Sequence, residues 1–180
     1  CDDPNTANDG FAQFNLADLD TQILDAQDPV NFTVTYYGTL EDAEASVNPL
    51  PTNFENTSNP QVIFARVDND TTVDDQCYDI TEVTLLVNLL PEFTLEDSYM
   101  ACIDVNGTEL IEETVMIIDL PDDQYSFEWI NPTGVIEATT AAHTPLMGGT
   151  YTAVATDILT GCIRAVSYTH LTLPTRTVVL

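Results

Sequence analysis

Four cysteines are the residues of this chain whose type and spacing point most directly to chemistry. They stand at positions 1, 77, 102 and 162, none belongs to a C-x-x-C pair, and the chain has only two histidines. Zinc sites usually gather Cys and His at much closer spacings, so this pattern favours disulfides over metal. We expect two bridges, Cys1–Cys77 and Cys102–Cys162. Disulfides persist in oxidising compartments, and they therefore indicate an extracellular protein.

Acidic residues clustered in two loops are the second group that could have a chemical role, as metal ligands. The weak candidates for calcium ligands are Asp2, Asp3 and Asp9 near the start, and Asp68, Asp70, Asp74 and Asp75 in a later loop. Calcium takes six to eight oxygen ligands, which flexible acidic loops supply. Neither loop has the twelve-residue spacing of an EF-hand. Two interpretations stay open at this point, a Ca²⁺ site or carboxylates that are simply solvated.

Catalytic motifs are missing from the sequence. It contains neither G-x-S-x-G nor H-E-x-x-H, and its only adjacent glycines are Gly148 and Gly149. His143 is expected to be solvent-exposed in a loop. With 30 acidic residues, some carboxylates must lie close together by chance, so a glycosidase pair cannot be recognised. We expect no catalytic residue and no enzyme activity.

The charge of the chain excludes several classes of partner. There are 30 Asp and Glu against 3 Arg and no Lys, a formal net charge of −27. Binding to nucleic acid or to an anionic membrane surface requires basic residues, so neither is expected. No apolar run approaches the ~20 residues of a membrane helix. The opening residues CDDPNTANDG are not a signal peptide, and an export signal would lie upstream of them.

Alternating apolar residues predict short strands in the first half of the chain. Residues 31–37 (NFTVTYY) alternate, residues 61–67 (QVIFARV) are apolar on both faces, and residues 78–90 form a long closing strand. The segment LEDAEASV is the one helical pattern, with acidic residues at its start. Pro91 ends the last strand and predicts a short, stiff joint.

The second half repeats this layout without repeating the sequence. Strands are expected at residues 93–103, 110–120, 125–130 and 149–157, with a turn at 131–134. Trp129 could pack against the predicted Cys102–Cys162 bridge or be an ordinary core residue. Short strands at this spacing predict an all-β fold. We expect two immunoglobulin-like sandwiches in tandem, residues 1–90 and 91–165, with one short helix in the first.

The last residues differ in composition from everything before them. Residues 164–180 contain no Asp or Glu and hold two of the three arginines. Residues 166–175 (VSYTHLTLPT) resemble the translation of a sequencing-library adapter. We therefore expect residues 166–180 to be non-native, which would truncate the second domain by its own last strand.

Several motifs resemble the repeat domains of large, secreted surface adhesins of gliding Bacteroidetes. The segment GTYTAVATDILTGC at 149–162 is similar to their closing motif, and YSFEWI at 125–130 to the strand before it. In the first half, DGFAQFNL, VTYYGTLEDAEA and QVIFARV carry the likeness. It implies immunoglobulin-like or PKD-like modules, type IX secretion, and a role in adhesion or gliding motility. The acidic stretch at residues 109–124 departs from the pattern and leaves the strand register there open.

The resemblance leads to two functional hypotheses. The first is a non-catalytic, structural or adhesive module of a large cell-surface protein, whose partners are neighbouring β-domains of the same parent chain. The alternative is a carbohydrate-binding accessory module of a secreted polysaccharide-degrading enzyme, for which Tyr36, Tyr37 and Tyr99 are the aromatic candidates. Extracellular polysaccharide or another surface would then be the partner. No ligand-binding residue is assigned from the sequence.

Overall fold

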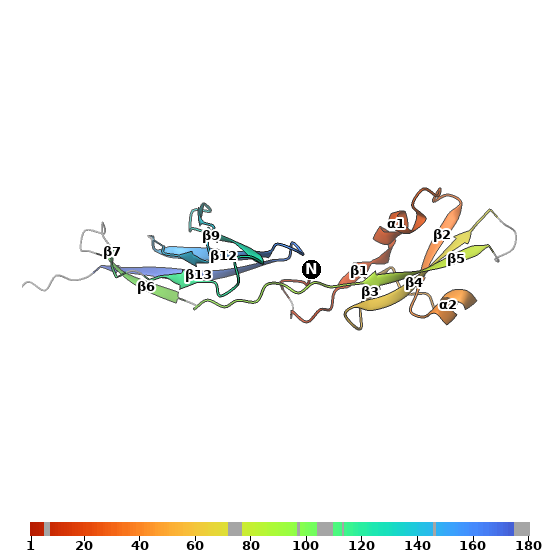
Figure 1. Cartoon of the computed structure of the whole chain (residues 1–180), viewed down its shortest axis with the longest axis horizontal. Helices are drawn as coiled ribbons and strands as arrows, with labels where there is room; N and C mark the ends of the chain where they lie inside the picture. The colour runs from red at the N-terminus through yellow and green to blue at the C-terminus, as the bar shows by residue number, and fades with distance from the viewer. Residues whose placement is uncertain are drawn as a thin grey trace, which may run out of the picture. The chain divides into compact units, whose positions relative to one another are not determined.

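The computed structural model describes residues 1–5, 8–71, 77–96, 98–103, 110–112, 114–145 and 147–174. Its contacts divide the chain into two compact units. The N-terminal unit is Asp2–Asn88, and the C-terminal unit is Leu89–Leu180 together with Cys1. Strands dominate both units (Figure 1), which confirms the expected all-β class. No helix in the described residues is long and apolar enough to span a membrane.

A three-stranded antiparallel sheet forms the centre of the N-terminal unit. Its order is β2 (Phe32–Tyr37), β4 (Gln61–Asn69) and β5 (Tyr78–Leu85). The strands β1 (Gln13–Asn15) and β3 (Asn53–Glu55) form a separate pair. The core contains Leu16, Tyr36, Ile63, Ala65 and Leu85. Burying these side chains against one face of the sheet supplies most of the unit's stability.

Two short helices lie on opposite sides of this sheet, as Figure 1 shows. The α2 helix (Leu40–Ala45) is the predicted one, and Thr39 caps it by accepting a hydrogen bond from the Asp42 N–H. The α1 helix (Asp20–Leu24), preceded by the 3-10 turn Leu16–Leu19, was not predicted. Its signal was present, because Leu16, Leu19 and Ile23 have helical spacing and pack on the core.

The end of β5 also differs from the prediction. The strand ends at Leu85 rather than continuing to Leu90. Both backbone groups of Val87 bond to the Asn59 side chain, with Asn59 Oδ1 accepting at 3.0 Å and Nδ2 donating at 2.7 Å. At Val87 the backbone bonds to the Asn59 side chain instead of to a neighbouring strand. The alternation of apolar residues therefore continues past Leu85, where the strand ends.

The C-terminal unit contains a six-stranded sheet and a two-stranded one. The large sheet has the order β10 (Ile136–Ala138), β9 (Tyr125–Ile130), β12 (Gly149–Asp157), β13 (Ile163–Pro174), β6 (Ser98–Ile103) and β7 (Leu110–Glu112). The small sheet pairs β8 (Met116–Ile117) with β11 (Ala142–His143). Only the β13–β6 pairing within the large sheet is parallel.

Aromatic residues fill the core of this unit. Trp129 is fully buried, and its indole N–H donates to the Thr140 carbonyl at 2.8 Å. Its ring neighbours are His143 and Tyr168, and Cys162 is not a member of this core cluster. Of the two interpretations of Trp129, the structure supports an ordinary core residue.

Strand β13 includes most of the segment that resembles adapter-encoded sequence. Two of its buried side chains, Tyr168 and His170, have hydroxyl and ring nitrogen atoms without a hydrogen-bond partner. Buried polar groups are nearly always paired, so this segment fits its surroundings poorly. That residues 166–180 are non-native stays a prediction, which re-reading the DNA around codon 166 tests.

The buried imidazole of His170 gives the stability of the chain a pH dependence. Burial, with a smaller contribution from nearby His143, lowers the pKa of His170 below its ordinary value of about 6.5. Below pH 6.5, His170 therefore binds a proton in the unfolded chain but not in the folded chain. This difference lowers the free energy of unfolding as the pH falls. We expect His170 to make the melting temperature at pH 5, relative to that at pH 8, lower than the titration of the 30 acidic residues alone would make it. The His170→Val variant should therefore be relatively more stable at pH 5 than its parent, and Tyr168→Phe should keep the parent's difference between the two pH values; an unchanged difference in His170→Val would contradict the assignment.

Candidate functional site

The structure contains one disulfide among the described residues, and it joins Cys1 to Cys162 with their Cα atoms 5.5 Å apart. The predicted pairs Cys1–Cys77 and Cys102–Cys162 are therefore wrong. Cys77 is a free, exposed thiol at the start of β5, and the side chain of Cys102 lies outside the described residues. The prediction failed because it assumed that Cys1 belongs to the unit that follows it, whereas its contacts place it with the C-terminal unit.

A tight turn after β12 positions Cys162. The Asp157 carboxylate accepts hydrogen bonds from the Thr160 N–H at 2.8 Å and the Leu159 N–H at 2.9 Å, and these bonds lower the pKa of Asp157. The Asp157 backbone bonds to Cys162 and Gly161. Gly161 has φ +73°, which favours glycine. The Asp-to-Gly-Cys part of the closing motif is thus the segment that presents the buried Cys162 sulfur.

Asp2 fixes the chain directly after Cys1. Its buried carboxylate accepts from the Gly10 N–H at 2.7 Å and the Asp3 N–H at 2.8 Å. Its own N–H donates to the Asn88 carbonyl at 2.8 Å. Asp2 and Asn88, the first and last residues of the N-terminal unit, are therefore hydrogen-bonded to each other. Asp2 directly follows the disulfide-bonded Cys1, and Asn88 directly precedes Leu89, where the C-terminal unit begins.

Two asparagines hold the segments around this point. Asn56 is buried and uses its whole side-chain amide: Oδ1 accepts from the Ala12 N–H, and Nδ2 donates to the carbonyls of Gly10 and Ser58. Asn59 bonds to Val87 as described above. We call Asp2, Gly10, Asn56 and Asn59 the terminal clamp. Most hydrogen bonds of the clamp join residues that are distant in sequence, as expected of a structural site.

Gly10 is the position of the clamp that tolerates no side chain. It has φ +81°, and an added Cβ would lie 2.7 Å from Asn59 Nδ2. Gly10→Ala should therefore combine backbone strain with displacement of Asn59, and we expect a loss of about 2–3 kcal/mol in unfolding free energy. Gly134→Ala is the matched control, because Gly134 has φ +83° with open space around it, and it should cost about 1 kcal/mol. Chemical denaturation measures both, and equal losses would show that the contact with Asn59 contributes nothing.

The five predicted calcium ligands that the structure describes form no metal-binding group. Asp2 bonds within the clamp, Asp68 pairs with Arg66 at 2.7 Å, and Asp70 accepts from the Thr33 hydroxyl at 2.7 Å. Asp3 and Asp9 accept from residues two positions on. The described residues contain no group of three or more His, Cys, Asp or Glu side chains that could hold a metal. Asp74 and Asp75 lie outside the described residues, so calcium binding by that loop stays a prediction.

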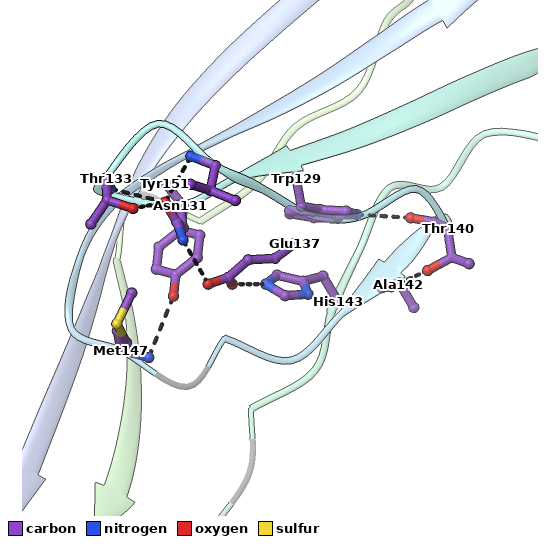
Figure 2. Close-up of polar contacts among 10 residues, drawn as sticks. Trp129, Asn131, Thr133, Glu137, Thr140, Ala142, His143, Met147 and Tyr151 are labelled. Carbon is purple, nitrogen blue, oxygen red and sulfur yellow. Dashed lines mark hydrogen bonds and ion pairs between the residues drawn. The ribbon is translucent and has the colours of Figure 1, made fainter.

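His143 is placed differently from the expectation of an exposed loop residue. It lies on β11 with its side chain 9% exposed, and Nε2 is 3.1 Å from Glu137 Oε2. Figure 2 shows Glu137 between His143 and Asn131, whose Nδ2 donates to Glu137 Oε1 at 2.9 Å. Asn131 Oδ1 in turn accepts from Thr133 and Val135. These contacts fasten the loop after β9 to the small sheet. Apart from the residue types, no sequence pattern indicates the His143–Glu137 pair.

Two of the three tyrosines considered for sugar binding are not available for it. Tyr36 and Tyr37 are buried, and Tyr99 is half-buried in an edge-to-face contact with Tyr168. A sugar stacks on an aromatic face only when the face is open to solvent. Of the residues on which the carbohydrate-binding alternative depended, Tyr99 alone keeps part of its side chain exposed.

The fold and the site define a class of protein: β-rich units in which a disulfide joins the first residue of the chain to Cys162 of the C-terminal unit. A family model, the Flavobacterium inter-domain disulphide bond domain, matches residues 1–91. The chain belongs to this family. The match fits a disulfide-bonded extracellular protein of the Bacteroidetes. No curated protein matches the chain.

Proposed function

We propose that this chain is a non-catalytic, tension-bearing module of a large extracellular surface protein that serves adhesion or gliding. The observation that carries the proposal is the Cys1–Cys162 disulfide, which has a sequence separation of 161. The N-terminal unit is therefore connected covalently to the C-terminal unit twice. One connection is the peptide bond after Asn88. The other is the peptide bond between Asp2 and Cys1, because the disulfide joins Cys1 to Cys162.

A bridge at these positions changes the path of a pulling force. Tension that enters at Cys1 and leaves after Cys162 passes through the sulfur atoms, and residues 2–161 lie inside a closed loop. A covalent bond does not yield at forces that unfold a β-domain. Fully extended, the enclosed segment would span on the order of 500 Å. The disulfide therefore protects the N-terminal unit, and the C-terminal unit up to Cys162, from being pulled out, which suits a protein that attaches a cell to a surface.

The neighbouring features support a structural role. The clamp joins the two ends of the N-terminal unit by hydrogen bonds, so its two covalent connections leave from adjacent residues. The formal charge of −27 makes neighbouring modules of similar composition repel one another, which keeps an array extended. Secretion by the type IX pathway is part of the proposal, because the likeness to gliding-associated adhesins implies it.

A cell-based comparison tests the adhesive role. Cys1→Ser should weaken attachment of the producing bacterium under flow, with little effect in still medium, because the bridge matters only under load. The exposed free thiol allows Cys77→Ser as the matched control, which should leave attachment unchanged. Equal attachment of the Cys1→Ser strain and its parent at every flow rate, at equal surface abundance, would refute a tension-bearing role.

A further inference from the structure

The outer edge of β5 is unpaired in the part of the chain that the structure describes. Among the described residues, β5 is the last strand of the order β2-β4-β5 and pairs with β4 alone. Eight residues, Tyr78–Leu85, form this edge, and most of them are exposed or half-buried. An open edge of this length can pair with another extended chain.

The hydrogen-bond phase of the sheet shows which backbone groups face outward. The Asn69 N–H donates to the Cys77 carbonyl at 3.0 Å, so Cys77 and every second residue after it bond toward β4. Antiparallel ladders alternate, and the N–H and C=O groups of Tyr78, Ile80, Glu82 and Thr84 therefore face away from the sheet. The Ile80 N–H is taken by the Asp79 carboxylate at 2.9 Å. Glu82 and Thr84 are left to receive a partner strand.

Two hollows lie beside this strand, on the face of the sheet where α1 packs, and together we call them the groove. One hollow of about 540 Å³ lies beside Tyr78–Thr81, and a second of about 400 Å³ beside Glu82–Leu86. Ile23 of α1 lines both, so they adjoin. Their apolar lining includes Leu24 and Phe32 in the first hollow and Phe14 and Leu19 in the second. Such a groove can receive the alternate side chains of an added strand.

The charge of the groove selects among possible occupants. Asp25 and Asp79 line the first hollow and Glu82 the second. The N-terminal unit has a single cationic side chain, Arg66, which is buried and paired with Asp68. A second copy of this acidic chain would meet like charges along the edge, which is unfavourable. A strand with Lys or Arg would meet opposite charges.

We propose that the β5 edge binds an extended segment of another protein in which apolar residues alternate with Lys or Arg. The segment pairs its backbone with Glu82 and Thr84 and places apolar side chains in the groove beside Ile23. Its basic side chains, on the opposite face of the added strand, lie near Glu82. The acidic edge thus prevents pairing between copies and admits a basic partner.

The test uses the whole oxidised chain and a synthetic peptide, acetyl-KVTVKVTVK-amide, with the Lys→Glu peptide as control. Titration calorimetry at low and high salt measures affinity, and amide exchange measures protection. We expect the basic peptide to bind, the acidic peptide not to bind, and affinity to fall with salt. The N–H groups of Glu82 and Thr84 should become protected.

Three variants identify the surface. Thr84→Pro removes an outward N–H without breaking the bond to β4, and it should reduce affinity at least tenfold with little change in melting temperature. Glu82→Lys should reduce affinity severalfold, and Glu41→Lys, the same charge change on exposed α2, should not. If Thr84→Pro does not fold, comparing the peptide affinities of Glu82→Lys and Glu41→Lys still tests the proposal. Equal binding of both peptides, equal effects of both Lys variants, or no binding would overturn the proposal.

Discussion

Cys1→Ser is expected to lower the melting temperature of the N-terminal unit by about 10–20 °C, which corresponds to roughly 2–4 kcal/mol. Cys1 lies in the C-terminal unit by its contacts and is bonded there to Cys162. While the C-terminal unit stays folded, an unfolded N-terminal unit is a closed loop held at both ends. The bridge removes conformations from the unfolded state, and its loss restores them.

The exposed Cys77 supplies the control for this experiment. Cys77→Ser removes a thiol of the same kind without touching the bridge, and it should change the melting temperature by less than about 2 °C. Calorimetry under oxidising conditions, repeated after reduction, measures both variants. Reduction should bring the parent chain to the level of Cys1→Ser. A parent chain that melts identically before and after reduction would show that the bridge adds no stability.

Asn56→Ala is expected to destabilise the N-terminal unit by about 2–4 kcal/mol. The substitution leaves the Ala12 N–H and the Gly10 carbonyl without their partner, and Asn56 is buried. Unpaired buried polar groups carry the full cost of lost hydration. Because the clamp holds the segment that follows Cys1, the change should also speed reduction of the Cys1–Cys162 bond by dithiothreitol.

Asn5→Ala is the matched control for the clamp. Asn5 is exposed and donates to Asp3 only two residues away, so its loss should cost less than about 0.5 kcal/mol. Urea denaturation compares the two variants, and alkylation of thiols over time follows reduction. If the two variants had the same free energy of unfolding and the same rate of disulfide reduction, the clamp would not hold this part of the unit.

The strand pattern of the chain could be predicted where alternation is clean. Residues 32–37, 61–69, 125–130 and 149–157 are strands, close to the bounds expected from NFTVTYY, QVIFARV, YSFEWI and GTYTAVATD. The α1 helix is short, and the apolar spacing of Leu16, Leu19 and Ile23 indicates it only when the preceding 3-10 turn is included. The early end of β5 depends on Asn59, which is distant in sequence, so local periodicity carries no sign of it.

The candidate site was harder to predict for the same physical reason. Cysteine spacing shows that bridges form but not which residues pair, and four cysteines allow three arrangements. Cys1 precedes the N-terminal unit in the sequence but belongs by its contacts to the C-terminal unit, where it pairs with Cys162. Three of the seven predicted calcium ligands, Asp2, Asp68 and Asp70, instead bond to the Gly10 N–H, the Arg66 guanidinium and the Thr33 hydroxyl.

Single-molecule pulling on the chain, with handles before Cys1 and after Leu180, tests the central claim most directly. The oxidised chain is expected to extend only by the residues that follow Cys162, on the order of 60 Å. Reduction should release residues 2–161 and add on the order of 500 Å as the units unfold. Cys77→Ser should behave as the parent. If the oxidised chain releases the full length before its handles detach, tension does not pass through the Cys1–Cys162 bond, and the account is wrong.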